Sequence, residues 1–171
     1  KENILIVHRS DALKQKIDAF KEEISQHANI ISAANSTQVP SDQYYQNTHW
    51  LEGWDRSDLF TMPTCYTSYN YHQALDLEIL EGRYFSPEMP RDSFAIIVNE
   101  AALKAFDIKD PMNTRFYNPG ENGEPDTFMP IIGVVKDFHF ESMHEEIHPM
   151  AIHFMNGNYE GVLVIKLGNG N

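Results

Sequence analysis

The sequence contains one cysteine, few basic residues for its number of acidic ones, and no run of about 18 apolar residues. Because Cys65 stands alone, an internal disulfide and a cysteine-rich zinc cage are both excluded. The 25 acidic and 13 basic residues give a formal net charge of −12, which repels phosphate backbones and anionic lipid headgroups. We therefore expect no nucleic-acid binding and no adhesion to a membrane surface.

The sequence does contain a large apolar fraction. Hydrophobic residues make up 42% of the chain and aromatic residues 12%, as in folded globular proteins. We expect the chain by itself to be soluble, and both of its ends to lie within a longer protein.

Hydrophobic periodicity predicts an α+β chain built from short strands and helices. Apolar runs at residues 4–7 and 30–37 indicate two strands, and the spacing between them indicates a helix over residues 10–27 that is capped by Ser10. We expect the apolar face of this helix to pack on a sheet that holds both residues 4–7 and residues 162–167. That face is formed by Leu13, Ile17, Phe20 and Ile24.

Further strands are predicted where β-branched and aromatic residues cluster. Asn99 is expected to cap a short helix, and the turn-forming residues between 118 and 126 predict a hairpin. The expected strands are residues 60–69, 77–80, 95–98, 114–117 and 127–135, and the expected short helices are residues 71–76 and 100–106.

Aromatic side chains gather in a polar stretch between residues 39 and 58, which we expect to be a loop. Rings of this kind form platforms for carbohydrate or peptide ligands, and they also cover irregular segments over small cores. Both interpretations stay open. The candidate partner or ligand surface consists of Tyr44, Tyr45, Trp50 and Trp54.

Residues 131–154 indicate a buried strand, a short helix and a second strand, with Pro149 ending the helix. Within them, His144-Glu145-Glu146-Ile147-His148 matches the zinc-protease signature H-E-x-x-H. That signature needs a continuing helix to hold two histidine ligands one turn apart, and Pro149 prevents the continuation. We therefore expect no metal ion at this motif and no catalytic residues in it, but a short amphipathic surface helix.

Three blocks follow one another along the chain. They are residues 77–86 (Leu-Glu-Ile-Leu-Glu-Gly-Arg-Tyr-Phe-Ser), residues 97–104 (Ile-Val-Asn-Glu-Ala-Ala-Leu-Lys) with Asp110-Pro111, and residues 132–140 (Ile-Gly-Val-Val-Lys-Asp-Phe-His-Phe) before Pro149. Together they resemble the periplasmic core domain of FtsX-like and MacB-like ABC transporter permeases of the Bacteroidetes type. Asn113 departs from the pattern, because the family usually has glycine there.

The resemblance implies a membrane-proximal βαβ (porter-like) subdomain that carries an inserted mixed α/β subdomain. On this chain the first would comprise residues 1–38 and 159–171, and the second would comprise residues 39–158. The family's second repeat would continue past Leu167 with a helix and a strand that this chain lacks.

The resemblance also implies a non-catalytic domain without cofactors, on the periplasmic side of the bacterial inner membrane, as part of an integral membrane protein. Such a domain would couple ATP-driven movement of membrane helices to export or to a periplasmic partner. Its partners would be an ABC ATPase subunit or domain, a second permease copy and a periplasmic protein, while the isolated domain would be monomeric. Two other classes stay open: an extracytoplasmic solute- or peptide-binding module, and a zinc metallopeptidase that uses residues 144–148.

Overall fold

The computed structural model describes residues 3–8, 13, 16–39, 44–120, 126–138, 146–155 and 161–168. Over these residues the chain is mixed α and β, with far more strand than helix. The strands are β1 (Ile4–His8), β2 (Ile30–Ser36), β3 (Tyr45–Leu51), β4 (Phe60–Thr67), β5 (Ile79–Gly82), β6 (Ile96–Asn99), β7 (Arg115–Asn118), β8 (Thr127–Val135), β9 (Ala151–Phe154) and β10 (Val162–Leu167). The helices are α1 (Ile17–Ile24), α2 (Tyr71–Ala74) and α3 (Glu100–Ala105), with 3-10 turns at η2 (Pro90–Phe94) and η3 (Pro111–Asn113).

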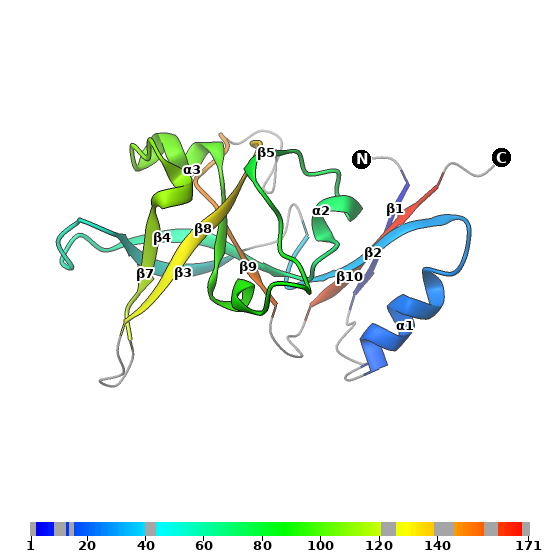
Figure 1. Cartoon of the computed structure of the whole chain (residues 1–171). Helices are drawn as coiled ribbons and strands as arrows, with labels where there is room; N and C mark the ends of the chain where they lie inside the picture. The colour runs from blue at the N-terminus through cyan, green and yellow to red at the C-terminus, as the bar shows by residue number, and fades with distance from the viewer. Residues whose placement is uncertain are drawn as a thin grey trace.

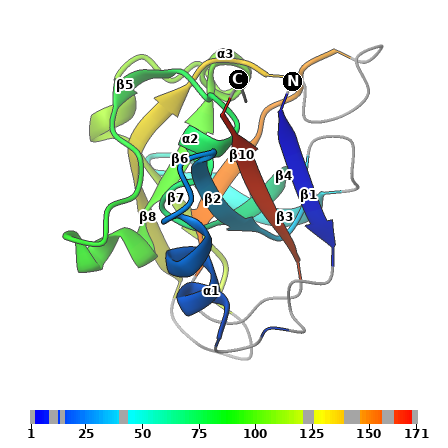
Figure 2. The same ribbon diagram turned by 90° about the vertical axis from the view of Figure 1, so that its right-hand side faces the viewer.

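At one end of the molecule β1, β10 and β2 form an antiparallel sheet of three strands (Figure 1). β10 lies between β1 and β2 and pairs with both, as Figure 2 shows from this end. The prediction that residues 4–7 and 162–167 share a sheet is therefore confirmed. β10 suits this central place because both of its faces are apolar: Val164 is buried on the face toward α2, and Leu163 on the face toward α1.

α1 covers one face of this sheet. Phe20 and Ile24 pack against a small buried cluster of Ala33, Leu163 and Ile165. None of the side chains of α1 is fully buried, because the helix meets the sheet along one stripe and its flanks face solvent.

The observed helix is shorter than the predicted one. It spans Ile17–Ile24 rather than residues 10–27, and Lys16 at its N-terminus makes no capping hydrogen bond through its side chain. The predicted cap, Ser10, lies outside the described residues. The apolar spacing thus indicated the packed face correctly but overestimated the extent of the helix.

The other end of the molecule is a ring of six strands. β4 pairs with β3, and the pairing continues through β7, β8, β6 and β9 back to β4. The β4–β9 and β6–β8 pairs are parallel and the other pairs are antiparallel. β5 pairs with the second half of β8. The apolar cluster of the ring comprises Leu51, Met62, Ile96, Val98, Ala102, Phe116, Met129, Ile131, Val134 and Ala151.

The two ends share one hydrophobic core. Strand pairing between them is limited to Ser36 of β2 and Thr67 of β4. Buried side chains nevertheless cross the junction, because Tyr71, the largest fully buried residue, belongs to the same cluster as Val164 and Ile152. The sheet and the ring therefore pack as one body, and the division at residues 38/39 and 158/159 stays a prediction.

Several predicted elements are confirmed. β7 and β8 form the expected hairpin. Asn99 caps α3 through its side chain, which accepts a hydrogen bond from the backbone N–H of Ala102. The helix predicted within residues 131–154 lies mostly outside the described residues, and the described residues 146–150 are not helical.

Two expectations need correction. Tyr45–Leu51 is the strand β3 rather than part of a loop, since its aromatic, threonine and histidine residues find a partner in β4. The strand predicted at residues 77–80 begins two residues later, at Ile79. No helix in the described segments has both the length and the apolar character needed to cross a bilayer.

Candidate functional site

The four aromatic residues of the candidate ligand surface do not lie on one surface. Tyr44 and Trp50 are buried, with 5% and 7% of their surface exposed, while Tyr45 and Trp54 are 53% and 42% exposed. The ring of Trp50 stacks on that of Tyr117, with ring centres 5.0 Å apart. Of the four residues only Tyr45 and Trp54 expose a large part of their surface, and the role of this candidate surface in binding stays a prediction.

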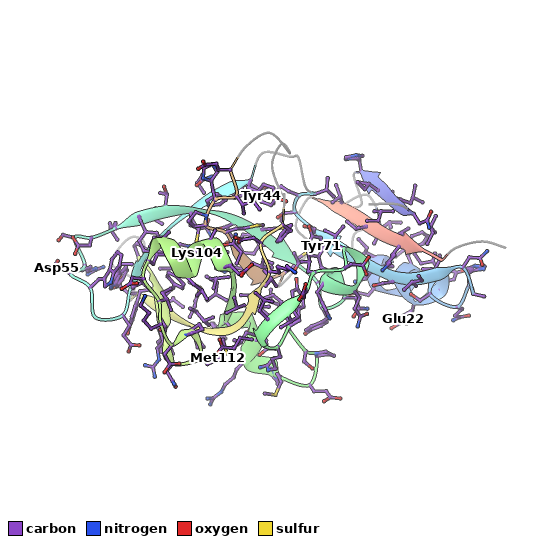
Figure 3. The ribbon with its side chains drawn as sticks, turned by 90° about the horizontal axis from the view of Figure 1, so that it is seen from above. Glu22, Tyr44, Asp55, Tyr71, Lys104 and Met112 are labelled. Atoms are coloured by element: carbon purple, nitrogen blue, oxygen red, sulfur yellow. The ribbon has the colours of Figure 1, made fainter. Side chains whose placement is uncertain are left out.

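Trp54 belongs to an aromatic cluster at the end of the β3–β4 hairpin. Its ring lies edge-on to Phe60 and Phe106, with centres 5.9 Å and 6.2 Å away, and those two rings are 4.1 Å apart. Leu59 beside it is half-exposed. This end of the molecule lies opposite the three-stranded sheet, as the labels Asp55 and Glu22 show in Figure 3.

The wall of the ring has an opening between β3 and β7. These strands pair only at Trp50–Tyr117 and Leu51–Phe116. Where the pairing stops, a cavity of about 400 Å³ is lined by uncharged residues that are mostly polar. They are Gln46, Asn47, Thr48, Asn118 and Pro119.

Two histidines lie inside the ring next to this opening. The side chain of His49 on β3 contacts Phe60 of β4, Phe116 of β7 and His153 of β9, so it points into the interior. His49 is fully buried and His153 is 7% exposed. Their ring centres are 6.0 Å apart and the ring planes differ by 21°.

Three of the four imidazole nitrogens of this pair make no well-formed hydrogen bond. Both ring nitrogens of His49 and Nε2 of His153 are buried without a hydrogen bond. Burial lowers the pKa of His49 to about 4, and a hydrogen-bonding interaction with the Asn118 side chain opposes this shift. Burial, together with the neighbouring His49, lowers the pKa of His153 to about 3. Both rings are therefore neutral at pH 7.

Sequence reasoning missed the histidine pair. His153 stands in the apolar stretch Ala151–Phe154, where a polar ring is unusual, and that was the available signal. The sequence around His49 contains no such signal, because this residue lies in a polar segment that was expected to be a loop.

Two further observations concern the reactive side chains of the described residues. Burial raises the pKa of the Cys65 thiol and disfavours the reactive thiolate, although the hydrogen bond with Ser36 Oγ, 3.0 Å from the sulfur, acts in the opposite direction. Within the part of the chain that the structure describes, no three His, Cys, Asp or Glu side chains form a metal-binding group. Of the H-E-x-x-H motif, residues 144 and 145 lie outside the described residues.

Comparison with known proteins establishes the fold. The chain is similar to the periplasmic region of MacB from Actinobacillus actinomycetemcomitans, with a TM-score of 0.66 and 15% identity over 99% of this chain and 77% of that one. It is also similar to the extracellular domain of the ABC-type transporter YknZ from Gram-positive bacteria, with a TM-score of 0.61 and 10% identity over 98% of this chain and 83% of that one. No protein-family model and no curated protein matches the sequence.

These likenesses cover nearly the whole chain. They show that it has the fold of the extracytoplasmic domains of ABC transporter permeases, in agreement with the family that the sequence blocks resemble. At 15% and 10% identity these likenesses establish the fold of this chain but not its activity.

Proposed function

We propose that this chain is the extracytoplasmic domain of an ABC transporter permease subunit, and that it passes ATP-driven movement of membrane helices to the extracytoplasmic side. The observation that carries the proposal is the adjacency of the start of β1 and the end of β10. Ile4 aligns with Lys166, and the backbone N–H of Leu167 donates to the carbonyl of Asn3 at 2.8 Å. Membrane helices attached next to the start of β1 and the end of β10 would both join the domain at the three-stranded sheet.

The shared core suits the domain to transmission. Because Tyr71 packs in one cluster with Val164 of the three-stranded sheet and Ile152 of the ring, a displacement of the sheet carries the ring with it. The half-exposed Trp54 and Leu59 belong to the segment between β3 and β4, which lies at the end of the molecule away from the three-stranded sheet (Figure 1). We assign this end to contact with a periplasmic partner.

The chain itself has no part in ATP hydrolysis in this proposal. An ABC ATPase subunit or domain acts through the membrane helices, and a second permease copy stands beside the first. The net charge of −12 disfavours association of isolated copies, so the membrane parts hold the pair together. The isolated chain should sediment as a monomer.

The test measures distances between spin labels in the full-length permease, in a Cys65→Ser background. Asp55→Cys marks the hairpin end and Glu22→Cys marks α1, at opposite ends of the domain (Figure 3). Between two copies, we expect the Asp55–Asp55 distance to change when ATP is added. Within one copy, diluted with unlabelled copies, the Glu22–Asp55 distance should stay constant.

Each distance tests a different part of the proposal. If the Asp55–Asp55 distance does not change when ATP is added while transport continues, this domain does not transmit the movement of the membrane helices. A Glu22–Asp55 distance that changes with ATP would show that the domain bends, against the shared core.

A second candidate function is an extracytoplasmic module that binds a solute or peptide. The observation that favours it is the opening between β3 and β7, because the amides of Gln46, Asn47 and Asn118 both donate and accept hydrogen bonds, as a peptide backbone requires. Insensitivity to ATP in the distance experiment would favour this alternative.

A further inference from the structure

Three side chains with buried polar atoms that make no well-formed hydrogen bond come together inside the ring. They are the imidazoles of His49 and His153 and the amide oxygen Oδ1 of Asn118. Buried polar atoms in native proteins are nearly always paired with protein, water or an ion, so a cluster of unpaired ones calls for an occupant. The three groups come from three different strands, β3, β9 and β7, and only the closure of the ring brings them together.

The positions of these groups suit a single ion. The ring centres of His49 and His153 are 6.0 Å apart, and two imidazoles that share one ion through bonds of about 2.0–2.1 Å have centres about 5–6 Å apart. The amide nitrogen of Asn118 donates a hydrogen bond to Met129 Sδ at 3.6 Å and so fixes the orientation of the amide. The oxygen Oδ1 is then the atom that can bind an ion. The Asn118 side chain also lies near enough to the ring of His49 to interact with it as a hydrogen-bond partner, as expected of two groups that would bind one ion.

The chemistry of the groups selects a cation. Neutral imidazole nitrogens and an amide oxygen offer electron pairs, and the chain around them carries a net charge of −12, which disfavours an anion. Imidazole is a preferred ligand of zinc, copper and nickel, whereas magnesium and calcium prefer sets made only of oxygen ligands. A first-row divalent ion such as Zn²⁺ is therefore the matching class.

The cavity between β3 and β7 reaches one of the three side chains, Asn118. Asn118 lines it together with Asn47 and Thr48, so the same residue faces both the cavity and His49.

We propose that His49, His153 and Asn118 bind one divalent transition-metal ion inside the six-stranded ring. The site is separate from the H-E-x-x-H motif, and it does not depend on the transmission of movement proposed above. A bound ion ties β3, β7 and β9 together and stiffens the ring at the place where β3 and β7 separate.

The test is a titration of the whole chain, stripped of metal with a chelator, with Zn²⁺ at neutral pH. We expect one equivalent to bind by calorimetry and the melting temperature to rise with zinc concentration, because an ion that binds only the folded state stabilises it. Co²⁺ in place of Zn²⁺ should give the visible absorption of a site with nitrogen and oxygen ligands.

Variants decide where the ion binds. His49→Gln and His153→Gln should each weaken binding by about a hundredfold or more. Asn118→Ala should weaken it by about tenfold, and because Asn118 is only half-buried this variant keeps the test valid if a histidine variant fails to fold. His144→Ala with His148→Ala is the matched control and should leave the affinity unchanged.

Three results would overturn the proposal. They are the absence of one-equivalent binding in the wild-type chain, unchanged affinity in both Asn118→Ala and a folded His49→Gln variant, and loss of binding in the double variant of residues 144 and 148. The last result would instead assign the metal to the H-E-x-x-H motif.

Discussion

Asn99 and Met150 exchange two hydrogen bonds. The backbone N–H of Met150 donates to Asn99 Oδ1 at 2.9 Å, and the backbone N–H of Asn99 donates to the carbonyl of Met150 at 3.3 Å. The same side chain caps α3 at Ala102 and donates from Nδ2 to the carbonyl of His148 at 2.9 Å. Asn99 thus fixes the segment before β9 against the start of α3.

Replacing Asn99 with Ala should lower the free energy of unfolding by about 3 kcal/mol, which is more than the roughly 1 kcal/mol of a lost cap. The excess arises because the N–H of Met150 and the carbonyl of His148 also lose a partner. Urea denaturation measures the change. Asn113→Ala, which removes an exposed hydrogen bond to Asp110, is the control and should cost about 0.5 kcal/mol or less. A cost for Asn99→Ala no greater than that of a cap would contradict the bridging role.

The histidine pair predicts a stability that falls in mild acid. In the folded chain burial lowers the pKa of His49 to about 4 and that of His153 to about 3, whereas the ordinary value is 6.5. The unfolded chain therefore binds protons below pH 6.5 that the folded chain does not. The contribution of the two histidines to the free energy of unfolding is therefore fully present above pH 6.5 and decreases as the pH falls. Below the pKa values of the folded chain this contribution does not decrease further.

Between pH 6.5 and 5 each imidazole should lower the free energy of unfolding by about 2 kcal/mol in metal-free buffer. Denaturation at a series of pH values measures the slope. His49→Gln should remove about half of it, since one of the two groups is gone. If the slope is unchanged in that variant, the loss of stability in acid arises from titratable groups other than His49.

Two glycines with positive φ should respond differently to alanine. Gly82 has φ +70°, and a Cβ there would collide with the carbonyl oxygen of Ile132 and lie 2.7 Å from Met112 Sδ. Gly53 has φ +86° and open space around it. Gly53→Ala should cost about 1 kcal/mol from backbone strain alone, and Gly82→Ala should cost about 1–3 kcal/mol more from overpacking. If thermal or urea denaturation shows the same loss in free energy of unfolding for both variants, β5 shifts to make room for the added methyl group.

Two phenylalanines test how much each end of the molecule depends on burial. Phe116 in the ring is fully buried, while Phe20 on α1 is only partly buried against the sheet. We expect Phe116→Ala to cost about 3–5 kcal/mol and Phe20→Ala about 1–2 kcal/mol. The value for Phe20 is lower than that for a buried helix face because α1 has no fully buried side chain. A larger cost at Phe20 than at Phe116 would reverse this ranking.

The sequence alone predicted the features that depend on neighbouring residues. The turn residues before Thr127 predicted the β7–β8 hairpin, the position of Asn99 predicted the cap of α3, and the apolar run Val162–Leu167 predicted β10. The three ordered blocks indicated the fold that the structural comparisons confirm. Local propensity and periodicity suffice for such features because each is set within a few residues.

The tertiary structure alone decided the rest. Tyr45–Leu51 became a strand because β4 offered it a partner, and Trp50 is buried where β3 pairs with β7 instead, while Tyr45 stays exposed. His49 and His153 meet only because the ring closes from β4 through β9, a pairing between segments far apart in the chain. Periodicity shows that a residue has a buried side but does not show which distant strand covers it, since long-range packing determines that choice.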